Sequence, residues 1–260
     1  MNLDLTGKHA LVCGSTQGIG KAAALELAAL GADVTLLARN EPRLKTAVAE
    51  LGGKGKHNYI VADFSDPAKL KNTIDDFLKK EKIIHILVNN TGGPPGGPIT
   101  EAKTEEFVSA FSNHLLCNHI LAQAVLPGMK SAKYGRIINV ISTSVKIPLK
   151  GLGVSNTIRA AVGNWAKTLS LEVAPFGITV NNVLPGATST QRLASIIETK
   201  SQKTNVDQVH IEKEMIAEIP AGRFGAPEEV AAAIAFLATP AAAYINGINV
   251  PVDGGRTGNL

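Results

Sequence analysis

The chain has 260 residues, of which 45% are hydrophobic and 18% are charged, the ordinary balance of a globular protein with a sizeable core. Aromatic residues make up only 4%, so Ala, Val, Ile and Leu must fill that core. The apolar runs are too short to span a bilayer, and the opening sequence MNLDLTGKHA lacks the basic-then-apolar pattern of a secretory signal. These features argue against a membrane protein and favour a cytoplasmic one.

The net charge of +4 comes from Lys and Arg residues that are spread along the chain without interleaved aromatic residues. This pattern does not favour a nucleic-acid partner, whereas a basic pocket for a phosphorylated small molecule fits it. The two cysteines, Cys13 and Cys117, are too few for a disulfide framework or a metal site. We expect both to be buried thiols, and we expect no metal cofactor.

Strand and helix signals alternate from one end of the chain to the other. Short runs rich in β-branched residues predict strands at 9–13, 33–38, 57–63, 85–90, 136–142, 178–185 and 247–252. Several of these runs are apolar nearly throughout, as expected for a sheet covered on both faces. The segments between them show helical patterns, such as IGKAAALELAAL, which ends at Gly31 in a C-cap position. The alternation predicts an α/β fold with a doubly wound parallel sheet, and no shift in composition divides residues 1–260 into separate domains.

One polar segment, residues 189–218, is long for a connection in such a fold. Segments of this length are usually functional lids or disordered loops. The segment carries Arg192, Lys200, Lys203 and His210, and we interpret it as a lid over a small-molecule substrate.

The first predicted strand leads through the turn CGSTQGIG, residues 13–20, into a helix rich in Ala and Leu. Glycine lets the backbone approach a pyrophosphate, and a helix N-terminus offers unpaired N–H groups and the positive end of its dipole. This context favours a dinucleotide, although the spacing is GxxxGxG rather than GxGxxG and a tight turn also uses glycine for conformation alone. The predicted cofactor-binding residues of the turn are Gly14, Ser15, Gln17, Gly18, Ile19 and Gly20.

The end of the second predicted strand distinguishes between the two nicotinamide dinucleotides. An acidic residue there would bind the adenosine ribose hydroxyl of NAD, whereas an arginine accommodates the 2′-phosphate of NADP. The sequence has Arg39 and Asn40 at this point and Glu41 only afterwards, so we expect NADP in preference to NAD. Gln17 adds no second positive charge. The alternative is that Arg39 is simply an exposed residue in a turn.

Further candidate residues follow the third, fourth and sixth predicted strands: Asp63, the run NNTG at 89–92, and Pro185 with Gly186. Open α/β sheets bind their ligands at the carboxyl ends of strands, so these positions form a set. The polar residues among them could equally form Asx turns.

These motifs, together with RIINVIS, ITVNNVLPG and the tail GRFGAPEEVAAAIAFL…GINVPVDGG, resemble the short-chain dehydrogenase/reductase family, and its 3-oxoacyl-acyl-carrier-protein reductases most of all. The resemblance covers essentially the whole chain. It implies a Rossmann-fold oxidoreductase that moves hydride between NAD(P) and an alcohol or ketone, and a homo-oligomer, either a tetramer or a dimer. It also implies that Asp63 and Phe64 border the adenine, that Asn90 and Gly92 border the ribose, and that Pro185, Gly186 and Thr190 lie near the nicotinamide.

The family's active site consists of a Ser, a Tyr, a Lys four residues after the Tyr, and usually an Asn on the preceding long helix. Aligned through RIINVIS and LSLEVAPFGITVNNVLPG, Ser142 falls on the serine, Ser155 on the tyrosine and Arg159 on the lysine. Counting back from QAVLP, His114 falls on the asparagine. Three of the four positions have changed, so the resemblance predicts a preserved scaffold with an altered proton-transfer set.

The replacement side chains have different acid–base chemistry. A serine hydroxyl is a much weaker acid than a tyrosine, and an arginine stays protonated, so Arg159 can hold ribose hydroxyls or an anion but cannot relay a proton. His114 is the nearest candidate acid, and Ser142 could polarise a carbonyl. The alternatives are that His114 caps or packs its helix and that Ser155 only caps the helix that it starts.

Two functional hypotheses follow. The first is an NADP-dependent oxidoreductase with an altered proton donor, acting on a carbonyl or hydroxyl substrate that the resemblance makes 3-oxoacyl-like. The second is a catalytically silent NADP-binding protein that acts as a redox sensor or an assembly partner. The basic lid segment favours the first hypothesis, and the joint change of Tyr and Lys favours the second.

Overall fold

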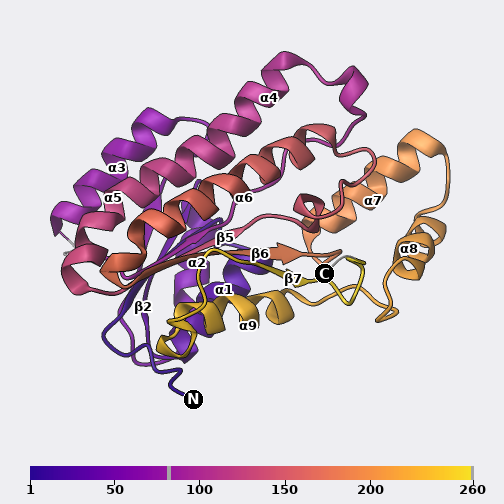
Figure 1. The fold of residues 1–260 in the computed structure, drawn as a ribbon. Helices are drawn as coiled ribbons and strands as arrows, with labels where there is room; N and C mark the ends of the chain where they lie inside the picture. The colour runs from indigo at the N-terminus through magenta and orange to yellow at the C-terminus, as the bar shows by residue number, and fades with distance from the viewer. Residues whose placement is uncertain (81–82, 259–260) are drawn as a thin grey trace.

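The computed structural model describes residues 1–80 and 83–258, which form one parallel sheet with helices on both faces (Figure 1). The strands are β1 (His9–Cys13), β2 (Asp33–Ala38), β3 (His57–Val61), β4 (Ile86–Asn89), β5 (Gly135–Val140), β6 (Ile178–Pro185) and β7 (Asn249–Val252). They lie in the order β3-β2-β1-β4-β5-β6-β7, and every neighbouring pair is parallel. The predicted single-domain α/β Rossmann fold is confirmed, and so are the predicted strands. Three of them are shorter than predicted by two residues at one end: β3 ends at Val61 rather than at residue 63, β5 ends at Val140 rather than at residue 142, and β7 begins at Asn249 rather than at residue 247.

Two layers of helices enclose this sheet. The helices are α1 (Gly18–Ala29), α2 (Glu41–Ala49), α3 (Pro67–Lys80), α4 (Thr104–Phe111), α5 (Cys117–Ala132), α6 (Gly153–Val173), α7 (Gln191–Thr204), α8 (Gln208–Ala217) and α9 (Pro227–Ala238). In Figure 1, α1, α2 and α9 cover one face and α3, α4, α5 and α6 cover the other. The core is therefore divided by the sheet into two apolar clusters, one on each face.

The sequence explains these elements locally. Every residue of β4 and β5 is buried, as required of strands covered on both faces. Helix α3 buries Leu70 and Ile74, which lie one turn apart, and keeps its lysines and aspartates in solvent. Gly31 ends the first helical segment with a φ of 96°, and its N–H donates to the Ala28 carbonyl at 3.0 Å, which confirms its predicted capping position.

The polar segment at 189–218 is helical rather than a long loop. It forms α7 and α8, which extend beyond the end of the sheet (Figure 1). The two helices share a small apolar cluster made by Leu193, Ile197 and Ile211. The alternative of a disordered segment is therefore wrong, whereas the role of a lid stays a prediction.

A ladder of asparagine side chains runs across four neighbouring strands, from β4 to the edge strand β7. Asn89 donates to Asn139 at 2.9 Å, Asn139 donates to Asn182 at 2.9 Å, and Asn182 donates to Asn249 at 2.8 Å. These residues are direct register partners on β4, β5, β6 and β7. The central amides of Asn139 and Asn182 both donate and accept, so burial does not leave them unpaired, whereas the Asn89 Oδ1 has no partner among the described residues.

Both cysteines are fully buried free thiols, as predicted. Burial raises the pKa of Cys117 to about 12, so this thiol stays protonated at neutral pH. Among residues 1–80 and 83–258, no helix is long and apolar enough to cross a membrane. Across the same two ranges, His, Cys, Asp and Glu form no group that could hold a metal ion.

Candidate active site

The order of the strands reverses between β1 and β4, where the chain leaves one half of the sheet for the other. Open α/β sheets place a ligand crevice at the carboxyl ends of the strands at such a point. Gly14 follows β1 and Asn90 follows β4, and the two residues are in contact. The Asn90 side-chain amide donates to the carbonyl oxygens of Cys13 at 3.3 Å and of Gly14 at 3.2 Å. Two predicted cofactor residues thus meet at the expected crevice.

Close packing explains the glycines of the first turn. Gly14 and Gly18 have φ values of 58° and 54°, in the left-handed region that favours glycine. A side chain at Gly14 or Gly20 would collide with Asn90. The turn therefore requires these glycines for its own conformation, whether or not a nucleotide is bound.

The N-terminus of α1 also has the properties of an anion site. Its N-cap residue, Gln17, makes no side-chain hydrogen bond to the first turn, and that turn carries no acidic residue. The hydroxyl of the buried Ser15 finds no hydrogen-bond partner in the described part of the chain. Unpaired N–H groups at the positive end of a helix dipole bind phosphate oxygens. The turn from Gly14 to Gly20, Ile19 included, therefore fits a dinucleotide pyrophosphate.

Two arginines, rather than one, lie beside this turn. Arg39 is exposed at the end of β2, and its charge contributes to lowering the pKa of Asp63, after hydrogen bonds from Ser65. Arg43 donates to the side-chain oxygen of Gln17 at 3.3 Å. Sequence reasoning missed Arg43, because its proximity depends on how α2 folds back after β2. The sequence feature that could have indicated this position is Asn40, a favourable N-cap residue. Its side chain accepts from the Arg43 N–H at 2.9 Å, and α2 begins at the next residue, Glu41.

The residues predicted to border the adenine and ribose have mixed surroundings. Asp63 accepts from the Ser65 N–H at 3.0 Å, which is the Asx turn left open as an alternative. Phe64 is partly buried against the core, and its carbonyl accepts from the Cys117 thiol at 3.3 Å. Gly92 has open space where a side chain would stand. These surroundings leave room for the adenosine part of a nucleotide beside Asp63, Phe64 and Gly92.

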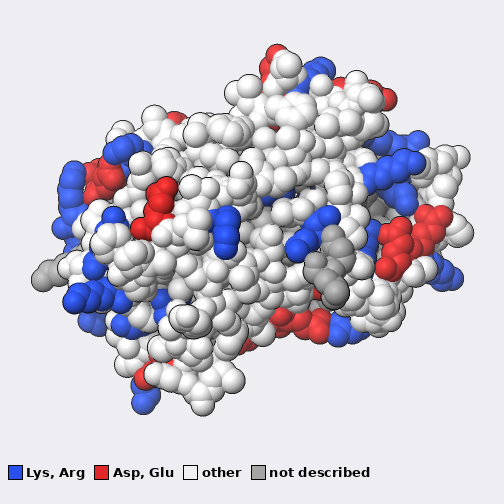
Figure 2. All heavy atoms as spheres, in the orientation of Figure 1, with Lys and Arg blue, Asp and Glu red and all other residues white. Residues whose placement is uncertain are grey.

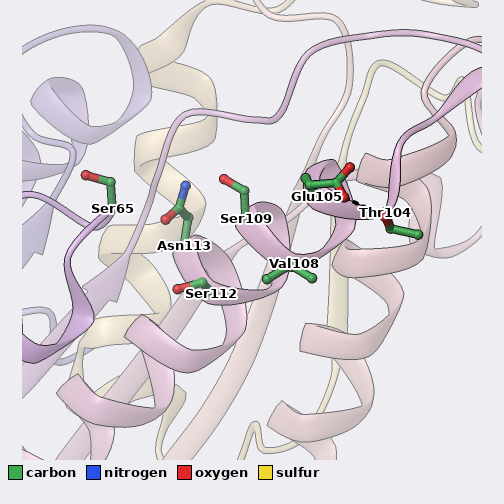
Figure 3. Close-up of a pocket in the computed structure, with 7 residues that line it drawn as sticks. All are labelled: Ser65, Thr104, Glu105, Val108, Ser109, Ser112 and Asn113. Carbon is green, nitrogen blue, oxygen red and sulfur yellow. Dashed lines mark hydrogen bonds between the residues drawn. The ribbon is translucent and has the colours of Figure 1, made fainter.

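A cavity of about 390 Å³ is lined in part by Ser65, the residue that follows Phe64. It is lined mainly by polar side chains of α4 and the following turn, with Ser65 on the opposite side (Figure 3). Its lining residues are Ser65, Thr104, Glu105, Val108, Ser109, Ser112 and Asn113. None of them is a candidate catalytic residue, so this cavity lies beside the site rather than at its chemical centre.

The residues after β6 close the crevice from the other side. The Gly186 N–H donates to the Val252 carbonyl at 2.9 Å, which holds the Pro185–Gly186 corner against β7. Thr190 caps α7 by accepting from the Leu193 N–H at 3.4 Å. Its methyl group lies 3.2 Å from the place where a side chain on Gly18 would begin. The start of α7 therefore lies over the glycine turn, which brings the first and sixth crossovers together.

Arg159 is a buried cation without an acidic partner. Its residue exposure is 8%, and it takes part in none of the ion pairs among the described residues. Its guanidinium donates to the carbonyl oxygens of Val140 at 3.0 Å and of Thr91 at 3.4 Å. Burial, with a smaller contribution from the charge of Arg192, lowers its pKa to about 10, so it remains charged at neutral pH. A charge in such a position is costly unless a counter-charge arrives.

His114 lies in a π-helical turn, Ser112–Leu116, that joins α4 to α5. It is 2% exposed, and its Nδ1 lies 2.6 Å from the Thr91 hydroxyl. Burial and the charges of Arg159 and Arg192 lower its pKa to about 3. In the protein alone these surroundings favour the uncharged ring, and the role of His114 as the acid stays a prediction. Single π turns are frequent at functional sites, which is consistent with a role for this residue.

Ser142 and Ser155 are both partly accessible. The Ser142 hydroxyl accepts from the Ser144 N–H at 3.1 Å and caps a short 3₁₀ turn, Thr143–Val145. Ser155 does not cap α6, because the N-cap residue is Leu152 and the helix starts at Gly153. The capping alternative for Ser155 is thus wrong, and its hydroxyl is available for another partner.

Arg192 is the basic residue of the 189–218 segment that reaches the site. It donates to the Pro94 carbonyl at 2.6 Å, whereas Lys200 forms an ion pair with Glu214 on α8 and the His210 ring lies 3.3 Å from the same carboxylate. The loop that follows β4 therefore contacts both arginines, through Thr91, Gly93 and Pro94. The run GGPPGGP at 92–98 is the local signal for it, because such a stiff turn either lines a pocket or only connects two elements.

Comparison with protein-family models and curated proteins agrees with this geometry. The family model described as enoyl-(acyl carrier protein) reductase matches residues 14–257. The 3-oxoacyl-[acyl-carrier-protein] reductase of Vibrio cholerae is 38% identical over 255 residues, which are 97% of this chain and 98% of the relative.

Two solved structures of similar fold are described as reductases. The L-sorbose reductase of Gluconobacter frateurii, solved with NADPH and L-sorbose, is 29% identical, with a TM-score of 0.93 and 100% of both chains covered. YwfH, described as an NADPH-dependent reductase involved in bacilysin biosynthesis, is 28% identical, with a TM-score of 0.92 over 97% of this chain and 99% of that one. The fold, the glycine turn and these similarities agree with the resemblance inferred from sequence: the chain belongs to the short-chain dehydrogenase/reductase family of oxidoreductases.

Proposed function

We propose that this protein reduces a carbonyl group with NADPH, using His114, Ser142, Ser155 and Arg159 in place of the family's usual proton-transfer set. The observation that carries the proposal is the buried, unpaired charge of Arg159 at the same end of the sheet as the glycine turn. The NADPH found in the similar L-sorbose reductase supports this choice of cofactor. The silent-binding alternative is not favoured, because the similar curated proteins are reductases.

The cofactor would span the crevice from β2 to β6. Arg39 and Arg43 would hold the 2′-phosphate, and the turn from Gly14 to Gly20 would hold the pyrophosphate. Asn90, Gly92 and Thr190 would then lie along the ribose and nicotinamide. A bound nicotinamide supplies the hydride in such a site.

The four candidate side chains would act on the carbonyl oxygen of the substrate. The free hydroxyl of Ser155 and that of Ser142 would donate hydrogen bonds to it, and the charge of Arg159 would stabilise the negative charge that develops there. With its lowered pKa, His114 would act as a neutral donor that polarises the substrate, while the proton itself comes from solvent through the hydroxyl groups. The hydride adds to the carbonyl carbon and the proton to its oxygen, so the ketone becomes an alcohol.

A titration tests the cofactor assignment without knowledge of the substrate. Purified protein is titrated with NADPH and with NADH, and binding is followed by nucleotide fluorescence. We expect saturable binding that is tighter for NADPH. Oxidation of bound NADPH on addition of ketones would then test the reaction. If neither nucleotide binds, the proposed function is wrong.

We also propose that the protein is a homo-oligomer, a dimer or a tetramer. Large apolar side chains are exposed on the helices of one layer: Val108, Phe111, Leu116 and Leu171. Figure 2 shows that much of the surface over this layer is uncharged. Burial of these side chains against a second copy would remove them from water. Light scattering of the wild type and of Leu171→Glu tests this, because a monomeric wild type would contradict it.

A further inference from the structure

Two guanidinium groups face one small space beside Gly93. A side chain built on Gly93 would lie 3.5 Å from Arg192 Nη2 and 3.8 Å from Arg159 Nη2, so both cations reach within 4 Å of the same point. Arg159 is the buried member, and Arg192 lies on the exposed start of α7. The two residues come from different crossovers of the sheet and meet only through the fold.

Neither cation has a counter-charge in the described part of the chain. Arg192 donates to the Pro94 carbonyl, and Arg159 donates to two backbone carbonyls. These contacts use only some of the five N–H donors that each guanidinium carries. Desolvation lowers the pKa of both groups, and the charge of Arg192 lowers that of Arg159 further. The pair is therefore electrostatically unfavourable until an anion lies between its members.

Other arginines of the protein show what a paired guanidinium looks like. Arg223 binds both carboxylate oxygens of Glu229, at 2.6 Å and 2.7 Å, and Arg256 pairs with Glu218. Arg136 is buried without a carboxylate, but it stacks 4.2 Å from the centre of the Tyr134 ring. The Arg159–Arg192 pair has neither kind of support. Two guanidinium groups that reach one point with donors to spare suit a carboxylate, whose two oxygens can accept from both.

We propose that Arg159 and Arg192 form a subsite for a carboxylate carried by the substrate, so that the protein reduces a small oxo acid rather than a neutral ketone. This rests on the proposed function, because the carboxylate belongs to the molecule whose carbonyl is reduced. Hydride goes to the carbonyl carbon and a proton to its oxygen, and the carboxylate is unchanged.

The position of the pair favours the substrate over the cofactor phosphates as the source of the anion. The pyrophosphate has the N-terminus of α1, and the 2′-phosphate has Arg39 and Arg43. Arg192 lies instead beside the loop that follows β4 and contacts Pro94 there. The same pocket contains His114 and Thr91, which are on the predicted catalytic side.

The test compares charged and uncharged probes on the protein without nucleotide. Pyruvate and acetoacetate are compared with their methyl esters, by thermal unfolding and by calorimetric titration. The variants are Arg192→Gln, Arg192→Lys and the control Lys200→Gln, which changes an exposed lysine of the same helix that is paired with Glu214. We expect at least one acid to bind the wild type about tenfold more tightly than its ester, as loss of a hydrogen bond to a charged group implies.

The variants decide which residue carries that preference. Arg192→Gln should lose the preference for the acid, Arg192→Lys should keep part of it, and Lys200→Gln should keep all of it. Equal binding of acids and esters, or no binding of any acid, overturns the subsite. So does an Arg192→Gln variant that keeps the preference but binds NADPH less tightly, because the arginine would then serve the cofactor. Failure of NADPH binding in the wild type would refute the proposed function without changing the probe result.

Discussion

Two groups of polar side chains lie toward the carboxyl ends of the strands, and they differ in how they are paired. The asparagine ladder from Asn89 to Asn249 uses its amides on one another across four strands. The Arg159–Arg192 pair has no carboxylate and leaves donors unused. Both groups cost free energy to desolvate. Hydrogen bonds within the protein offset most of that cost in the ladder, where the Asn89 Oδ1 alone lacks a partner among the described residues, but not in the arginine pair.

This difference in pairing indicates which group stabilises the fold and which group binds a ligand. A buried polar group that the fold itself satisfies stabilises one strand register and needs no ligand. A buried charge that the fold leaves unpaired is destabilising alone and becomes favourable when a ligand supplies the opposite charge. We therefore expect changes in the ladder to affect stability, and changes in the arginine pair to affect ligand binding and turnover.

The largest expected effect is on the ladder. Asn139→Ala removes two hydrogen bonds and leaves a donor of Asn89 and an acceptor of Asn182 buried without partners. We expect the free energy of unfolding to fall by about 3 kcal/mol, measured by urea denaturation. Asn249→Ala at the half-buried end of the ladder is the matched control and should cost about 1 kcal/mol. Equal losses in the two variants would show that the ladder does not act as a connected unit.

Arg159→Met is expected to lower activity strongly while changing stability little, the opposite of Asn139→Ala. Removal of an unpaired buried cation should change the free energy of unfolding without nucleotide by less than about 1 kcal/mol, because the lost hydrogen bonds are offset by relief of desolvation. Reduction of the best ketone or oxo acid found should fall about 100-fold in kcat/KM. A stability loss as large as that of Asn139→Ala would instead make Arg159 a structural residue.

The sequence predicted the scaffold well and the site only partly. Strands at 178–185 and 33–38 were readable because parallel strands covered on both faces are apolar and β-branched nearly throughout. The contact of Arg43 with Gln17 could not be predicted from the sequence, because it depends on how the start of α2 packs against the start of α1. The same holds for the choice of Arg192 over Lys200 as the residue that faces the pocket, because polar residues in a helix give no sign of which neighbour they meet.

A smaller effect is expected at the far end of the cofactor site, where the arginines are exposed. Arg39→Ala and Arg43→Ala should each weaken NADPH binding about tenfold, because each removes a charge-assisted contact to the 2′-phosphate. NADH binding should change little, and fluorescence titration measures both. Lys45→Ala is the control, since Lys45 is exposed on α2 and pairs with Glu41. Equal losses for the two nucleotides in the Arg39 variant would remove it from 2′-phosphate recognition.

The smallest effect concerns the proton on His114 and its dependence on pH. Its pKa is about 3 in the folded chain against an ordinary value of 6.5, so between these values the unfolded chain binds the extra proton. Stability must therefore fall as pH decreases below 6.5, by about 1 kcal/mol between pH 7 and pH 5.5 for this residue alone. His114→Asn keeps a polar side chain and cannot titrate, so its unfolding free energy should fall less over the same range. The difference between the two pH profiles isolates His114 from other acid-sensitive groups such as His85, whose pKa burial lowers to about 4. Parallel profiles would mean that His114 has the same pKa in the folded and unfolded chains, so that its ring could itself donate a proton near neutral pH.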